Sequence, residues 1–186
     1  MSGSIAFVGD GLTAGGRWDE WFPAHTVHNF GGSGDTTDEI IAKMDVIVDA
    51  QPDAVVLLIG TNDLGWRRSD EYVVRNIETF LVTLRKRLPH TRVLVQSVLP
   101  RERDYAKTIR SINRHLRQFA PTQRAQYLDL WPVMAEPDGE ISATYSSDRL
   151  HLNDEGYAAW VAELGPALET LFLTAPTTSA IPIQRV

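Results

Sequence analysis

The stretch DAVVLLIG, residues 53–60, is an almost unbroken apolar run of strand length. A strand with one face in water would alternate apolar and polar residues. A continuous run is instead typical of a central strand in a parallel sheet, where helices cover both faces. Amphipathic helical patterns lie on both sides of this run in the sequence. We therefore expect an α/β protein built around residues 53–60.

Further apolar runs alternate with helical patterns along the rest of the chain. The runs cover residues 4–9, 25–31, 91–99 and 125–131, and the helical patterns cover residues 36–51, 69–88, 105–120 and 153–172. Asp35 or Thr36 can cap the first helix and Ser69 the second, whereas Gly165–Pro166 should interrupt or kink the last. Five βα repeats predict a three-layer α/β/α sandwich with a five-stranded parallel sheet in flavodoxin-like order.

This pattern predicts one domain over residues 4–173, followed by a C-terminal tail over residues 174–186. The tail, TAPTTSAIPIQRV, has the composition of a linker. We expect it to be held by the domain, by a neighbouring molecule or by a second subunit. The last case would make the protein a homo-oligomer assembled through its tail.

Composition excludes several classes of function. The 186 residues carry a formal net charge of −6, which argues against non-specific binding of nucleic acid. There is no cysteine, so disulfides, thiolate zinc sites and thiol nucleophiles are excluded. No apolar run approaches the length of a membrane span. No signal peptide is visible, which favours the cytoplasm, but the opening MSGS resembles the remnant of an expression tag and leaves a removed leader open.

Small, polar and titratable residues follow each predicted strand. The segments are DGLT (10–13), GGSGDTT (31–37), GTNDLGW (60–66), LPRERD (99–104) and SSDRLHLND (146–154). Because ligands of open parallel sheets bind outside the carboxyl ends of the strands, these segments should form one site.

Four blocks of this edge, in order, resemble the SGNH hydrolases, also called the GDSL esterase/lipase family. FVGDGL is similar to the first block except at its serine, and GGSGDTT is similar to the second, with Gly34 at its glycine position. GTND matches the third block with Asn62, and DRLH matches the fourth with Asp148 and His151. The resemblance covers about residues 4–172.

The resemblance implies a carboxylic ester hydrolase that needs no cofactor and no metal. His151 would be the general base, and Asp148 would accept a hydrogen bond from its Nδ1. The backbone N–H groups of residue 11 and Gly34, with the Asn62 amide, would form the oxyanion hole, in which one donor is worth roughly 3 kcal/mol. Asp10 would support the site, either by tying its turn together or as a second carboxylate.

The chain departs from the family at residue 11, where glycine replaces the nucleophilic serine. Without that hydroxyl no acyl-enzyme can form, and loss of such a serine costs on the order of 10⁶ in turnover in subtilisin. We expect an engineered Ser→Gly variant, because the base, its partner acid and the oxyanion donors all remain. A natural non-catalytic relative that binds an acylated or carboxylate ligand is the alternative. A third reading is slow hydrolysis by a water that His151 activates.

Short loops predict an open, shallow site for a small-molecule ester with a short acyl chain, an acetyl group on a sugar or an aryl ester. The residues expected to line its wall are Leu12, Trp66, Leu99, Tyr145 and Leu150. We expect structural roles for Ser33, within its own loop, and for Asp63, which should brace its loop. The arginines at 67, 68, 101 and 103 are expected to be solvated loop charges rather than an anion site. A phosphate cradle formed by GDGLTAGG is weak, because it has no lysine and leaves Asn62, Asp148 and His151 unused.

Overall fold

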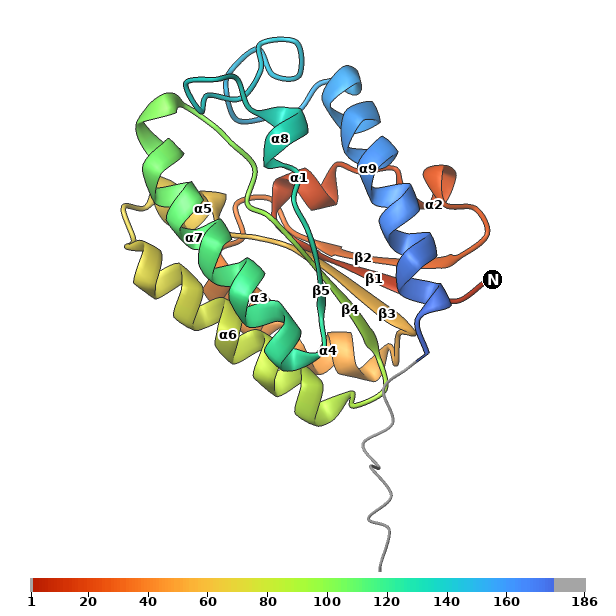
Figure 1. The fold of residues 1–186 in the computed structure, drawn as a ribbon. Coiled ribbons are helices and arrows are strands. Elements are labelled where there is room, and N and C mark those ends of the chain that lie inside the picture. The colour runs from red at the N-terminus through yellow and green to blue at the C-terminus, as the bar shows by residue number, and fades with distance from the viewer. Residues whose placement is uncertain (1, 176–186) are drawn as a thin grey trace, which may run out of the picture.

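A computed structural model describes residues 2–175, and its centre is a five-stranded parallel sheet in the order β2-β1-β3-β4-β5 (Figure 1). The strands are β1 (Ser4–Gly9), β2 (Thr26–Gly31), β3 (Ala54–Leu58), β4 (Arg92–Gln96) and β5 (Gln126–Leu128). All four pairings are parallel, so the predicted sheet is confirmed. The central strand β3 is buried along its whole length, as its apolar run predicts.

Helices cover both faces of the sheet and divide the core in two. On one face lie α3 (Thr37–Ala42), α4 (Met44–Asp49), α6 (Asp70–Arg87) and α7 (Ala106–Phe119). On the other lie α1 (Gly11–Ala14), α2 (Trp18–Trp21), α8 (Trp131–Met134) and α9 (Asp154–Leu173). The remaining short elements are α5 (Thr61–Gly65), η1 (Arg103–Tyr105) and η2 (Ala120–Gln123). Alternate residues of β3 point into the two halves of the core, which gives the three-layer sandwich.

The helix predicted over residues 36–51 is two helices in the structure. The chain bends at Lys43, which closes α3 by donating its backbone N–H to the Glu39 carbonyl. The Lys43 ammonium then reaches back to the Phe30 carbonyl at 3.3 Å and to the Asp35 carboxylate. These contacts tie Lys43, at the bend, to Phe30 and Asp35, which both precede α3 in the chain.

The predicted interruption of the last helix at Gly165–Pro166 is wrong. The helix α9 runs from Asp154 to Leu173 with Pro166 inside it. Proline removes one backbone donor there, but Leu164, Leu168 and Leu171 are buried against the sheet on both sides of it. The packing of these side chains outweighs the loss of one backbone hydrogen bond.

The two ends of the described chain lie side by side, at the edge of the sheet opposite the loops that follow the strands (Figure 1). Gly3 packs so closely on Phe172 of α9 that a Cβ at residue 3 would lie 2.8 Å from the Phe172 ring. Arg92 covers the same ring, with its guanidinium carbon 5.5 Å from the ring centroid. The predicted tail lies outside the described residues from residue 176 onward.

Candidate active site

His151 and Asp148 form a hydrogen-bonded pair in the loop that precedes α9. The His151 Nδ1 lies 2.6 Å from Asp148 Oδ2, and the His151 backbone N–H donates to Asp148 Oδ1 at 2.8 Å. The hydrogen bond from the imidazole lowers the pKa of the Asp148 carboxyl, and the backbone N–H groups of His151 and Leu150 lower it further. An ionised carboxylate on Nδ1 leaves Nε2 free to take up a proton, which is what a general base requires.

The turn after β1 brings Gly11 to the same edge of the sheet. Asp10 caps α1 by accepting a hydrogen bond from the Leu12 backbone N–H at 2.9 Å. The Tyr157 hydroxyl of α9 donates to the Leu12 carbonyl at 2.7 Å and so fixes the turn from the far end of the chain. A Cβ at residue 11 would meet only the Ser33 Cα, at 3.6 Å, an ordinary contact. The backbone at residue 11 therefore has room for a side-chain Cβ, which a serine requires.

Gly34 and Asn62 supply polar N–H groups from the next two loops. Gly34 has φ +78°, a left-handed conformation that a glycine adopts without strain, and a Cβ built on it would meet no atom within 4 Å. The Asn62 side chain donates one Nδ2 hydrogen to the Asp35 carbonyl at 2.8 Å. Because an amide nitrogen carries two hydrogens, this bond fixes the direction of the second one.

These groups line one small depression of about 50 Å³. Its lining residues are Asp10, Gly11, Leu12, Ser33, Gly34, Thr61, Asn62, Leu150 and His151. The predicted nucleophile position, base and oxyanion donors thus meet in space from four separate loops. Asp148 lies directly behind the imidazole, at its Nδ1.

Asp10 combines both roles that its sequence position allows. One carboxylate oxygen caps α1, and the other is buried with no hydrogen-bond partner among the described residues. Burial raises the pKa of Asp10 to about 7, and the negative charge of Asp35 adds to this increase. The carboxyl group therefore braces the turn and also contributes a titratable group to the wall of the depression.

Of the five residues predicted to line the pocket, two line the depression and three do not. Leu12 and Leu150 line the depression, whereas Leu99 is buried in the core below α9 and Tyr145 packs against that core. Trp66 is 75% exposed and lies outside the lining. Strand-end position identified these residues, but it does not tell whether a side chain turns toward the loops or into the core.

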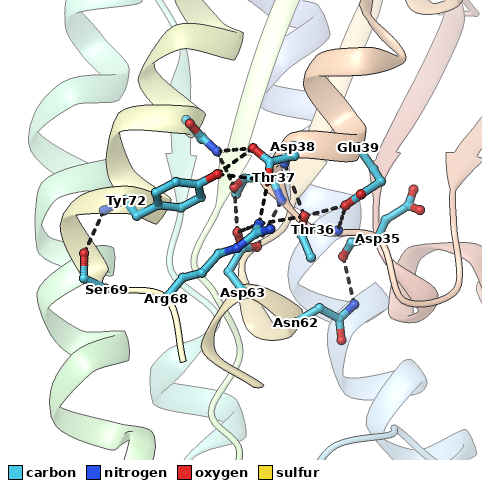
Figure 2. A network of polar contacts seen from close by, with 11 residues as sticks. Asp35, Thr36, Thr37, Asp38, Glu39, Asn62, Asp63, Arg68, Ser69 and Tyr72 are labelled. Atoms are coloured by element: carbon cyan, nitrogen blue, oxygen red, sulfur yellow. Dashed lines mark hydrogen bonds and ion pairs between the residues drawn. The ribbon is translucent and has the colours of Figure 1, made fainter. Parts of the chain in front are cut away.

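Two of the arginines predicted to be solvated loop charges are braced instead. Arg101 is 8% exposed, donates to the Thr61 carbonyl at 2.9 Å, and stacks over Tyr105. Arg68 belongs to a polar network that joins α3, α5 and α6 (Figure 2). Sequence reasoning missed this network, because its members lie far apart in the chain.

The network centres on the fully buried carboxylate of Asp63. It accepts hydrogen bonds from the Thr37 backbone N–H at 3.0 Å and from the Thr37 hydroxyl at 2.7 Å. Arg68 Nη1 lies 3.1 Å from the same carboxylate and 2.8 Å from that of Asp38. The Tyr72 hydroxyl also donates to Asp38, at 2.8 Å. These bonds join the segment after Gly34 to the helix that carries Asn62.

Within residues 2–175, no three histidine, aspartate or glutamate side chains lie together in a way that could hold a metal ion. Over the same residues, no helix combines the length and the apolar character needed to cross a bilayer.

Known proteins are similar to this chain in sequence and in fold. The model of the GDSL-like Lipase/Acylhydrolase family matches residues 4–159. Platelet-activating factor acetylhydrolase IB subunit alpha1 of Homo sapiens is 32% identical over 165 residues, which cover 82% of this chain and 70% of that protein. The alpha2 subunit of Mus musculus is 30% identical over 166 residues, with 83% and 71% covered.

Solved structures agree in architecture. A GDSL-like lipase of Bacteroides thetaiotaomicron has a TM-score of 0.78 at 22% identity, with 90% of this chain and 88% of that chain covered. The acetyl-xylooligosaccharide esterase Axe2 of Geobacillus stearmophilus, as a mutant, has a TM-score of 0.72 at 17% identity, with 87% and 92% covered. From the family match and the sequence relatives, the chain belongs to the GDSL-like lipase/acylhydrolase family.

Proposed function

We propose that this chain is a short-chain acyl esterase, built for Ser-His-Asp chemistry, that lacks its nucleophile. One observation carries the proposal: His151, Gly34 and Asn62 line the same small depression as Gly11, with Asp148 on the imidazole. Membership of an acylhydrolase family supports the reaction class.

In a serine form, the chemistry would follow from these positions. The residue 11 hydroxyl would attack the acyl carbon while His151 Nε2 takes its proton, and Asp148 would stabilise the resulting imidazolium. The N–H groups of residue 11 and Gly34 and the Asn62 amide would hold the oxyanion. His151 would then pass the proton to the leaving alkoxide, and water would release the acid. With glycine at residue 11, the first bond cannot form.

The small depression favours a small acyl group. A volume of about 50 Å³ leaves room for an acetyl group but not for a long chain directed into the wall. The names of two similar proteins, an acetylhydrolase and an acetyl-xylooligosaccharide esterase, point to the same acyl group. We therefore propose acetyl esters as the substrate class.

An engineered replacement remains our explanation for Gly11, since the backbone there has room for the Cβ of a serine and the partners of that serine are all retained. A natural relative that binds a carboxylate or an acylated ligand is the second candidate. It is favoured by Gly34 and Asn62, whose N–H donors need no nucleophile in order to bind an oxygen anion.

The test is the Gly11→Ser variant, assayed with p-nitrophenyl esters of two, four and eight carbons. Turnover should rise by up to about 10⁶-fold and should be highest with the acetyl ester. Gly11→Ala is the matched control, because its Cβ occupies the same space without a hydroxyl, and it should stay inert. If the serine form is inert as well, and acetate binds the unchanged chain, the binding function replaces the esterase.

A further inference from the structure

Arg68 lies at the point where the two loops of the predicted oxyanion hole are joined. Its Nη1 lies 3.0 Å from Thr36 Oγ1 at the end of the first loop, 2.8 Å from Asp38 in α3 and 3.1 Å from Asp63 in α5. Gly34 is two residues before Thr36, and Asn62 is one residue before Asp63. We propose that Arg68 is a positioning residue that fixes the Gly34 N–H and the Asn62 amide relative to each other. This inference builds on the proposed function.

Charge explains why an arginine is needed at this place. Asp63 is fully buried, and Asp38 lies beside it with its carboxylate 42% exposed. Among residues 2–175, Arg68 is the one cation in contact with Asp63. A buried carboxylate that loses its cation is strongly destabilised, so Arg68 adds to the direct Thr37–Asp63 bonds a charged contact between the start of α3, which carries Asp38, and α5, which carries Asp63.

Neighbouring side chains keep the guanidinium in place. Its central carbon stacks over the Tyr72 ring, 4.9 Å from the centroid, and the Tyr72 hydroxyl binds Asp38 on the far side. The Arg68 backbone N–H donates to the Asp63 carbonyl at 3.0 Å. Asn76 adds bonds to Thr37 Oγ1 and Asp38, both at 2.9 Å. The Tyr72 ring and the acceptors around Nη1 thus restrict the guanidinium from two directions.

A direct bond completes the connection to the site. Asn62 Nδ2 donates to the Asp35 carbonyl, which lies between Gly34 and the Thr36 that Arg68 contacts (Figure 2). If the segment 34–38 moves relative to α5, this bond changes, and so does the direction of the second Asn62 hydrogen. Displacement of such a donor by about 1 Å can cost on the order of 10²-fold in rate.

The kinetic test compares Gly11→Ser with the double variant Gly11→Ser/Arg68→Ala on p-nitrophenyl acetate. We expect kcat to fall by about 10- to 100-fold while KM changes little, because the contacts that the oxyanion makes in the transition state are lost. Arg68→Lys should recover only part of the loss, since an ammonium keeps the charge but has no planar group to stack on Tyr72. Arg87→Ala is the control: it breaks an ion pair to Asp45 at the other end of α6 and should leave kcat unchanged.

A structural readout does not depend on activity. In the Gly11 chain, Arg68→Ala should shift the NMR signals of the Gly34 N–H and the Asn62 side-chain amide, and Arg87→Ala should not. If Arg68→Ala does not fold, Tyr72→Phe removes a bond to Asp38 and should shift the same two signals. Unshifted signals, or an unchanged kcat in a folded double variant, would overturn the inference. An inert Gly11→Ser with shifted signals would refute the proposed esterase and leave the positioning role standing.

Discussion

The two sides of the candidate site are built in opposite ways. On one side, Asp148 and His151 are three residues apart in an exposed loop, with 52% and 72% of their side chains in solvent. On the other, the loops of Gly34 and Asn62 are held by a buried network around Asp63. The first arrangement is local and costs the fold little. The second depends on contacts between distant parts of the chain. Loss of a carboxylate should therefore lower kcat with little loss of stability on the exposed side, whereas on the buried side it should lower the free energy of unfolding.

The largest effect tests the exposed side. In the Gly11→Ser background, Asp148→Asn should lower kcat by about 10⁴-fold, as loss of the partner acid does in serine proteases. This corresponds to about 5.5 kcal/mol in the barrier. The free energy of unfolding should change by less than about 1 kcal/mol, because the pair is exposed. Steady-state kinetics and urea denaturation measure the two effects, and a large loss of stability would contradict the local character of this pair.

A smaller effect, on stability alone, tests the buried side. In the unchanged Gly11 chain, Asp63→Ala should lower the free energy of unfolding by about 3 kcal/mol, because it removes the acceptor of the Thr37 backbone N–H and hydroxyl and one of the two carboxylates that Arg68 contacts. Asp148→Ala is the matched comparison and should cost less than about 1 kcal/mol. Urea denaturation of both variants checks the difference. Equal losses would remove the contrast between the two sides.

The smallest effect concerns Asp10, which borders both sides. Burial raises its pKa from the ordinary value of 3.8 to about 7 in the folded protein. Between pH 3.8 and pH 7 the folded state therefore binds a proton that the unfolded state has lost. Stability from this group is therefore greatest at low pH and is lost as pH rises toward 7. Between pH 5 and pH 8 the loss should be roughly 2.5 kcal/mol.

The Asp10→Asn variant keeps an acceptor for the Leu12 N–H but cannot ionise. Its stability should therefore lack this part of the pH dependence. Urea denaturation of both proteins at pH 5 and pH 8 isolates the contribution from other titrating groups. A pH dependence that is the same in both proteins would show that Asp10 is not protonated at neutral pH.

The contrast between the sides also explains what sequence reasoning could reach. Strand positions followed from apolar runs, and the β1 prediction of residues 4–9 matches the structure at both ends. The pairing of Asp148 with His151 is implied by the family resemblance, and their spacing of three residues allows it. Both features depend on neighbours in the chain.

The buried network could not be predicted in this way. Apart from the contact between Arg68 and Asp63, its bonds join residues 26 to 39 positions apart, such as Thr37 with Asp63 and Tyr72 with Asp38. The bend at Lys43 and the unbroken course of α9 through Pro166 have the same origin, since contacts with distant groups override local preference in both. The prediction that Leu99 and Tyr145 line the pocket is wrong, because the position of a residue in the loops at the sheet edge does not specify whether its side chain points to the site or to the core.

The close packing of Gly3 against Phe172 places the two ends of the fold together, at the edge of the sheet opposite the candidate site. A short peptide joining them would not cross the sheet or touch the depression, and new termini could be opened in the exposed loop around Asp138. In such a circular permutant, His151 would come before residue 11 in the chain, whereas in the present sequence it comes after it. Asp148, His151 and residue 11 would then lie on one continuous segment that runs from the loop before α9 through α9, the linker and β1. Such a segment is convenient for screening substitutions at residue 11 together with its neighbours.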